Sequence, residues 1–303
     1  MTTPTPLERA PDSLAGDREL LLKREDLHEL GAFKWRGALP VLEGYRTRGV
    51  DTVVTASTGN HGAATAWAGK RLGVRVVVYA PAGAAQAKLA LIEGLRAEVR
   101  LVGADLDEAK ERALDYADEH GFPLFEDGAE RAQFDGYGAI ADEILDALGT
   151  PPGAVVVPVG NGALLGGIGL RLRARSPGTL RVGVAAKEAP VMAESWAAGR
   201  PVTSDRSATF ADGLAVRVAI PFAVDVLAEA ASSMLLVSER ELAEAVGAYA
   251  SAGIRAEGAA AAALAALPQL EDVEGPVVLI VTGRNIDDTL HVRACERPES
   301  FPA

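Results

Sequence analysis

Apolar residues along this chain gather in short runs, separated by alanine-rich segments in which apolar positions recur with helical spacing. Between residues 52 and 125 the runs predict strands and the longer segments predict helices. Such alternation with short connections is typical of a parallel sheet with right-handed crossovers. The predicted strands are 52–55, 74–79, 98–102 and 123–125, and the predicted helices are 60–72, 84–95 and 105–119.

The same alternation resumes after the stiff Pro-Pro-Gly sequence at 151–153. The strongly apolar run 154–159 leads into a glycine-rich turn and an apolar helix, and the alanine- and leucine-rich stretch 257–267 predicts a buried helix. The whole pattern predicts an α/β fold built on open parallel sheets. Further strands are predicted at 19–23, 180–185, 234–237 and 277–281, and further helices at 36–48, 137–148, 188–198, 221–230 and 239–252.

Composition limits the partners and the compartment of the protein. The 303 residues carry a formal charge of −12, which argues against nucleic acid or an anionic membrane but does not exclude a small anionic ligand. Cys295 is the sole cysteine, so no intrachain disulfide can form. No apolar run reaches membrane-spanning length, and the first twelve residues lack the apolar core of a signal peptide. We therefore expect a soluble cytoplasmic protein.

A lysine between two aromatic residues is the first candidate for chemistry. Lys34 stands between Phe33 and Trp35, with Gly31 and Gly37 three residues away on either side. A lysine removed from water is more readily neutral, and a neutral amine is a nucleophile that forms Schiff bases with carbonyl compounds such as pyridoxal phosphate. The alternative is a surface lysine with the aromatic rings packed beneath it.

Three turns that follow predicted strands carry the remaining candidates. The stretch 55–62 combines hydroxyl side chains and two glycines at a helix N-terminus, which suits a substrate carboxylate or a plain helix cap; its His61 fits a base or a structural histidine. The glycines of 159–167 would let the backbone wrap a phosphate, whereas their spacing does not match a dinucleotide motif. At 282–285 a threonine hydroxyl would face a ring nitrogen, or the turn simply ends a strand.

Taken in order, these motifs resemble the fold-type II pyridoxal-phosphate enzymes of the serine/threonine dehydratase group, which have a tryptophan synthase beta-like fold. The similarity covers almost the whole chain, from the Thr-Pro-Leu sequence at 5–7 to Asn285. The shared motifs are 23–25, 31–38, 57–62, 160–164, 211–213, 257–258 and 282–285.

The resemblance implies a role for each candidate residue. Lys34 would hold pyridoxal 5'-phosphate as a Schiff base and later remove the Cα proton of the substrate, and Phe33 would lie against the cofactor ring. The other implied cofactor contacts are Asn60 with the 3-hydroxyl, Gly160, Asn161, Gly162, Ala163 and Leu164 with the phosphate, Thr282 with the pyridine nitrogen, and Glu257 nearby. The substrate carboxylate would be held, largely through backbone groups, by Ser57, Thr58, Gly59 and His61.

The implied reaction is β-elimination from a small hydroxy amino acid of the serine, threonine or 3-hydroxyaspartate type, which gives a 2-oxo acid and ammonia. An alcohol such as Thr282 does not enforce protonation of the ring nitrogen, so prompt loss of a β-leaving group is favoured over transamination. The alternatives are a β-replacement synthase of the threonine synthase or cysteine synthase type and an amino-acid racemase. A non-catalytic small-molecule-binding protein is a more remote alternative.

The chain departs from the family pattern at several positions. Asn161 and Ala163 interrupt the glycine loop, and Asn161 makes it similar to that of the threonine synthases. Thr58 stands where serine racemases carry a serine used as acid and base, and its bulk and stiff side chain disfavour racemisation. Ala185 and Val191 stand where some relatives carry acidic metal ligands, so no metal site is predicted there.

The resemblance also implies how the chain is organised. We expect a large cofactor-binding domain of residues 1–51 plus 130–303 and a small mobile domain of residues 52–129. The small domain would carry the carboxylate-binding turn and close over the substrate. A homodimer is expected on the same ground.

Overall fold

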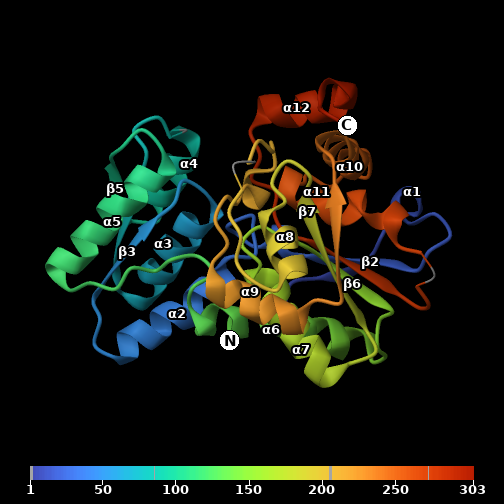
Figure 1. The fold of residues 1–303 in the computed structure, drawn as a ribbon, viewed down its shortest axis with the longest axis horizontal. Coiled ribbons are helices and arrows are strands. Elements are labelled where there is room, and N and C mark those ends of the chain that lie inside the picture. The colour runs from blue at the N-terminus through green and yellow to red at the C-terminus, as the bar shows by residue number, and fades with distance from the viewer. Residues whose placement is uncertain (1–2, 85, 205–206, 272) are drawn as a thin grey trace. The chain divides into compact units, whose positions relative to one another are not determined.

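A computed structural model describes residues 3–84, 86–204, 207–271 and 273–303 (Figure 1). The chain forms two compact units: unit 1 comprises Met1–Phe33 and Tyr137–Ala303, and unit 2 comprises Lys34–Gly136. It passes from one unit to the other after Phe33 and again within helix α6 (Arg131–Leu148). The domain limits expected from the sequence, 52–129 for the small domain, stay a prediction.

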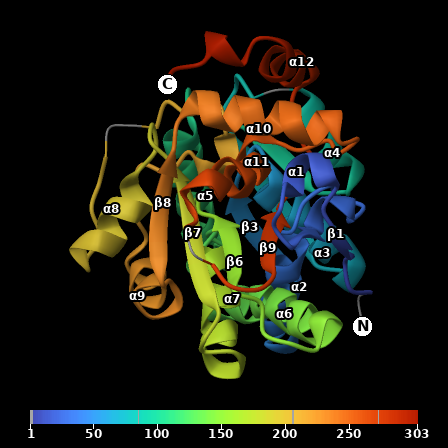
Figure 2. The ribbon, with the colours of Figure 1, turned by 90° about the vertical axis from the view of Figure 1, so that its right-hand side faces the viewer.

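Unit 1 is built on a six-stranded sheet in the order β1-β2-β9-β6-β7-β8. All of its neighbouring strand pairs are parallel except β1–β2, which is antiparallel. Figure 2 shows β8, β7, β6 and β9 following one another across this sheet. The antiparallel edge strand β1 was not predicted, whereas the other five strands agree with the predicted runs to within one residue at each end. The strands are β1 (Leu7–Arg9), β2 (Leu20–Arg24), β6 (Ala154–Pro158), β7 (Leu180–Ala186), β8 (Ser233–Val237) and β9 (Val277–Val281).

Helices cover both faces of this sheet, because successive side chains of a strand point to opposite sides. Val182 of β7 joins a core that includes residues of α10 (Glu239–Ser251) and α11 (Gly258–Ala265). Its neighbour Gly183 faces Leu165 of α7 (Ala163–Arg175). The alanine-rich α11 is buried, as predicted. The remaining helices of unit 1 are α1 (Asp12–Ala15), α8 (Val191–Ala198), α9 (Pro221–Ala230) and α12 (Asp288–Glu296), with 3₁₀ turns at Glu25–Leu27, Asp212–Leu214, Leu267–Gln269 and Pro298–Ser300.

Unit 2 is built on three parallel strands in the order β3-β4-β5. The predicted strand 123–125 is wrong as a strand: it contributes a single parallel bridge, between Leu124 and Val54. The sheet and its helices otherwise follow the prediction closely. The elements are β3 (Thr52–Ala56), β4 (Arg75–Ala80), β5 (Glu98–Leu101), α2 (Trp35–Thr47), α3 (Asn60–Leu72), α4 (Gln86–Gly94) and α5 (Leu106–His120).

The helices α3 and α5 cover opposite faces of this small sheet. A Cβ added to Gly69 of α3 would lie 2.3 Å from Val76 Cγ2, so glycine permits a close approach of helix and strand there. The next residue, Val77, lies in the core that contains Ala109 and Ala113 of α5. The first turn of α3 therefore lies just beyond the carboxyl end of β3.

Within the described part of the chain, none of the helices combines the length and the apolar character needed to cross a bilayer.

Candidate active site

The glycine loop after β6 approaches a second predicted motif through its backbone. A Cβ on Gly160 would lie only 2.2 Å from the carbonyl oxygen of Gly213, so this contact requires glycine. Asn161 Oδ1 accepts a hydrogen bond from the Ala163 N–H at 3.1 Å, which shapes the entry into α7. The structure thus brings together the loop 160–164 and the motif 211–213, which lie far apart in the sequence.

The N-terminus of α7 suits the phosphate group of the cofactor. Its N-cap residue is Gly162, with φ 88°, and a glycine offers no side chain to the N–H groups of the first turn. The positive end of the helix dipole and these N–H groups favour an anion. Asn161 Oδ1 occupies the first of these N–H groups, that of Ala163, so a phosphate would depend on the N–H groups that follow it and on the glycines at 160 and 162.

The end of β9 forms a second part of the unit 1 site. Thr282 is buried, with 2% of its surface exposed. The Glu257 N–H donates to the Gly283 carbonyl at 3.0 Å, and Glu257 Oε2 accepts from the Asn285 N–H at 3.2 Å. A Cβ on Gly283 would lie 2.7 Å from Glu257 Oε1, so glycine makes room for this carboxylate. Glu257 is therefore positioned by the turn that contains Thr282.

The first part of the lysine motif is hydrogen-bonded to the same turn. The Phe33 N–H donates to the Thr282 carbonyl at 3.1 Å, and the Arg284 N–H donates to the Gly31 carbonyl at 2.9 Å. Gly31 has φ 66°, a conformation that favours glycine. The Phe33 ring lies 5.1 Å from the ring of Tyr137. These bonds fix the residue that directly precedes Lys34.

In unit 2, the turn between β3 and α3 offers backbone N–H groups. The N-cap of α3 is Gly59, so none of the neighbouring hydroxyl or amide side chains occupies the capping position. Ser57 Oγ accepts from the Gly59 N–H at 3.1 Å, and the Ser57 N–H donates to the Tyr79 carbonyl at 3.0 Å. Asn60 is the first residue of α3, beside Thr58 in the same turn. This geometry favours the anion-site interpretation of 57–62 over the plain helix cap.

The side chain of His61 points into unit 2 rather than out of it. Nε2 lies 3.1 Å from Thr55 Oγ1 and 3.2 Å from the Phe125 carbonyl oxygen, and the ring meets the Phe125 ring edge-on at 4.6 Å. Burial lowers the pKa of His61, an effect that the charge of Asp127 opposes and that of Lys34 supports. The ring is therefore neutral at pH 7. A role of His61 in carboxylate binding would run through its backbone.

Lys34 is paired with a carboxylate that the sequence analysis did not single out. Lys34 Nζ lies 2.6 Å from Asp127 Oδ2, and 17% and 24% of the two side chains are exposed. Asp127 Oδ1 accepts a hydrogen bond from Gln133 Nε2 at 2.6 Å and lies 3.6 Å from His61 Nδ1. Burial alone would raise the pKa of Asp127, but the charge of Lys34 reverses this and holds it well below its usual range. Asp127 is thus ionised at neutral pH.

A signal for Asp127 was present in the sequence. It follows the apolar run 123–125, whose parallel bridge to β3 places its carboxyl end at the same edge of the sheet as the turn 57–62. Glu126 and Asp127 follow this run, and acidic residues just after an apolar run in a parallel arrangement are candidates for a ligand-binding edge. The pairing with Lys34, 93 residues away, could not be read from the sequence.

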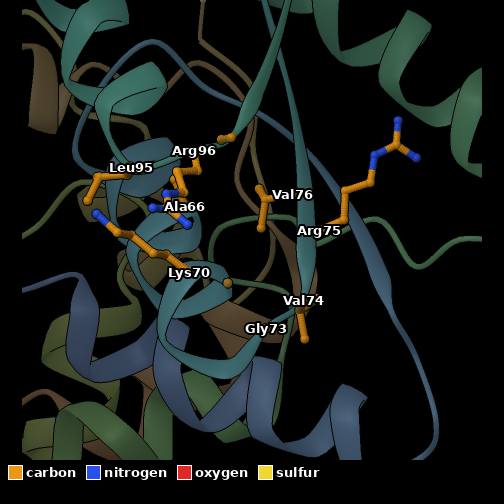
Figure 3. Close-up of a pocket in the computed structure, with 10 residues that line it drawn as sticks. Ala66, Lys70, Gly73, Val74, Arg75, Val76, Leu95 and Arg96 are labelled. Carbon is orange, nitrogen blue, oxygen red and sulfur yellow. The ribbon is translucent and has the colours of Figure 1, made fainter.

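Unit 2 also contains a pocket of about 220 Å³ at the far end of α3 from the turn 57–62 (Figure 3). Lys70 and Arg96 point to the same side of it, whereas Arg75 points away and pairs with Glu98 at 2.5 Å. The C-termini of α3 and α4 lie among its lining segments, and cations there complement the negative ends of the helix dipoles. The charges of this pocket therefore have a structural explanation.

Comparison with known proteins identifies a family that the chain matches. The family model described as "Pyridoxal-phosphate dependent enzyme" matches residues 1–283. The L-threonine ammonia-lyase of Thermotoga maritima is 33% identical over 275 residues, which cover 89% of this chain and 68% of that protein. The biosynthetic L-threonine dehydratase IlvA of Mycobacterium leprae is 34% identical over 307 residues, or 98% of this chain and 72% of that protein.

A solved structure is similar over almost the whole chain. The processed form of threonine deaminase isoform 2 from Solanum lycopersicum has a TM-score of 0.92 and 28% sequence identity, and the match covers 99% of this chain and 89% of that one.

Proposed function

The chain belongs to the family of pyridoxal-phosphate dependent enzymes, and from this premise we propose that it eliminates water and releases ammonia from a small hydroxy amino acid, L-serine or L-threonine. The family, the fold-type II α/β architecture and the cofactor predicted from the sequence are confirmed by the family match and by the structural similarity. The predicted reaction class, a hydroxy amino acid dehydratase, is supported by two relatives named for threonine dehydration or ammonia release.

We propose a role in holding the cofactor for each candidate residue. In unit 1 the loop Gly160–Leu164 would bind the phosphate, the Thr282 hydroxyl would face the ring nitrogen with Glu257 beside it, and Phe33 would contact the ring. In unit 2 Asn60 would bind the 3-hydroxyl. Lys34 would hold the cofactor covalently through its amine, which requires it to leave Asp127. Bound pyridoxal phosphate supplies the electron sink for the electrons released at the substrate Cα.

The chain's own groups would bind the substrate and move its proton. The backbone N–H groups of Ser57, Thr58, Gly59 and His61 would receive the substrate carboxylate at the N-terminus of α3, where the helix dipole assists. Lys34, neutral after it releases the cofactor, would remove the proton from Cα. Asp127 would then stabilise the ammonium group that forms on Lys34, once that nitrogen returns to the carboxylate beside which it lies in the structure.

One observation supports this proposal most strongly: Lys34 is a partly buried amine beside an ionised carboxylate and directly follows a residue that is hydrogen-bonded to the Thr282 turn. A surface lysine with aromatic rings beneath it would not be expected to have this arrangement. The Lys34 side chain is neither fully exposed nor fully buried, as expected for an amine that exchanges one partner for another.

The proposal is tested with the purified protein, pyridoxal phosphate and a panel of L- and D-serine, L-threonine and 3-hydroxyaspartate isomers. We expect stoichiometric release of 2-oxo acid and ammonia from L-serine or L-threonine. Inversion of the substrate without ammonia release would favour a racemase. Product formation that depends on an added nucleophile would favour a β-replacement synthase, and a protein that binds pyridoxal phosphate without turnover of any of these would contradict the proposal.

Two expectations about assembly and compartment stay predictions. A small amino acid is the partner that the relatives support. The homodimer rests on the family resemblance alone, and the cytoplasmic location on the composition of the chain.

A further inference from the structure

Glu239 is a buried carboxylate that takes no part in the proposed reaction. It is the first residue of α10 and has 3% of its surface exposed. Its Oε2 atom accepts a hydrogen bond from the Phe210 N–H at 2.8 Å. Burial raises the pKa of Glu239, and the Phe210 N–H opposes this effect. Because a carboxylate is costly to bury without hydrogen bonds, the bond to Phe210 compensates for the burial of this group.

The segment that Glu239 holds leads directly into one of the shared motifs. Phe210 immediately precedes the motif 211–213. The Ala211 N–H donates to Thr209 Oγ1 at 3.1 Å, and the Leu214 N–H donates to the Ala211 carbonyl at 2.7 Å. The turn therefore has a defined internal shape, and the bond at Phe210 ties this shape to the start of α10.

The same motif lies against the loop that would receive the cofactor phosphate. The ideal Cβ position of Gly160 is 2.2 Å from the Gly213 carbonyl oxygen, so the two backbones are in direct contact. Closely packed groups do not move independently, and a shift of Gly213 must displace the loop 160–164 or open a gap beside it. The contacts therefore run in sequence from Glu239 through the turn to the loop, and all of them lie within unit 1.

We infer that Glu239 is a positioning residue for the phosphate loop: by holding the Phe210 N–H, it fixes the turn against which Gly160 packs and so sustains the affinity for the cofactor. This inference rests on the proposed role of the loop 160–164 in phosphate binding. Glu239 acts without touching the cofactor. It keeps the loop in its binding conformation, so that less conformational freedom is lost when the cofactor binds.

A purely local role of Glu239 in α10 is the alternative. Acidic residues in the first turn of a helix stabilise it through the helix dipole, and Glu241 occupies the same turn. Ser238 caps α10: its Oγ accepts from the Glu241 N–H at 3.3 Å, and its N–H donates to Glu241 Oε2 at 2.6 Å. A helix with this reciprocal cap does not need a further buried carboxylate in order to begin. The bond from Glu239 instead joins the helix to a residue 29 positions away in the chain.

The test measures the affinity of the cofactor-free protein for pyridoxal phosphate, followed by visible absorption. E239M keeps the volume of the side chain but removes the acceptor, so we expect the affinity to fall by about fivefold or more. E239Q removes the charge but keeps an oxygen that accepts the Phe210 N–H, so its affinity should stay within about threefold of the wild type. S238A removes the cap of α10 and should lower the urea midpoint without changing the affinity.

A double-substitution cycle with G160A shows whether Glu239 acts through the loop. If both substitutions disturb the same contact, the second adds little to the effect of the first. We expect G160A/E239M to bind pyridoxal phosphate no more than about twofold more weakly than G160A alone.

Other outcomes would overturn the inference. Wild-type affinity in E239M would refute it, and a loss in E239Q as large as that in E239M would show that the charge matters and not the hydrogen bond. An equal loss in S238A would make Glu239 a helix-stabilising residue only, and effects that multiply in the cycle would place its action outside the loop. If E239M does not fold, E239A removes the same acceptor and serves instead. A wild-type protein that binds pyridoxal phosphate but releases no 2-oxo acid would refute the proposed reaction and leave this inference standing.

Discussion

Unit 1 holds its candidate residues by the shape of the backbone, whereas unit 2 holds them by charge. In unit 1, glycines at 160 and 283 allow neighbouring groups to approach to distances at which a Cβ would collide. In unit 2, Lys34, Asp127 and Gln133 form a polar cluster in which each distance is that of a strong hydrogen bond or ion pair. Unit 1 is therefore suited to binding a ligand of fixed shape, and unit 2 to transferring a proton.

The difference predicts how each unit responds to change. A site made by close backbone contacts is sensitive to added atoms and hardly sensitive to pH, since few of its groups titrate. A site made of ionised and buried titratable groups tolerates small changes of shape but depends on pH and on each charge. Substitutions that change shape in unit 1 or a titratable group in unit 2 test whether this comparison holds.

The largest effect of shape is expected at Gly160. G160A would drive a methyl group against the Gly213 carbonyl oxygen, 2.2 Å from the ideal Cβ position, so the loop must move. We expect the affinity for pyridoxal phosphate to fall by at least about tenfold. Titration of the cofactor-free protein, followed by visible absorption, measures it at several pH values, and the loss should be the same at each.

Gly178 provides the matched control for this change. It lies in unit 1, and an added Cβ would find no atom within 4 Å. G178A should therefore retain the wild-type cofactor affinity. An unchanged affinity in G160A, or an equal loss in both variants, would show that the close contact between the loop 160–164 and the motif 211–213 does not matter for cofactor binding.

A smaller effect, on the pH dependence of stability, is expected at His61. Burial lowers its pKa in the folded chain, whereas the unfolded chain has an ordinary histidine pKa of about 6.5. Below about pH 6.5 the unfolded chain binds a proton that the folded chain does not. The free energy of unfolding therefore decreases as the pH falls through this value. Between pH 7.5 and 5.5 we expect the wild type to lose about 1 kcal/mol more unfolding free energy than H61Q.

Urea denaturation of the cofactor-free protein at several pH values checks this difference. Asp127 and Lys34 are unchanged in H61Q, so their contribution cancels in the comparison. H120Q, which removes an exposed histidine ring from α5 of the same unit, is measured in parallel. A pH dependence in H61Q equal to that of the wild type would mean that the buried ring of His61 titrates normally.

Much of the fold could be predicted from the sequence because its elements are locally determined. Helix α3 begins at Asn60 and ends at Leu72, just before Gly73 in the left-handed conformation, and β9 matches its apolar run at 277–281. The failures also have local reasons. Strand β1 has only three residues, and the run 123–125 is equally short and forms a single bridge. Helix α12 was missed because its nine residues are mostly polar.

The sequence indicated which residues are candidates, but not which of them are in contact. The glycine loop and the lysine motif could be identified because glycine and lysine are unusual in such surroundings. The contact of Gly160 with Gly213 and the pair of Lys34 with Asp127 join residues far apart in the chain. Such pairings depend on the register of strands and the docking of helices, which no local pattern specifies. Asp127 was overlooked for this reason.

The central claim is that Lys34 binds the cofactor covalently, and borohydride reduction tests it most directly. The purified protein is incubated with pyridoxal phosphate, reduced with borohydride, digested and analysed by mass spectrometry, with K34A treated in parallel. We expect a single stable adduct on the peptide that contains Lys34, loss of that adduct in K34A, and loss of ammonia release by about a thousandfold or more in the same variant. An adduct on another lysine, or full activity in K34A, would contradict the account.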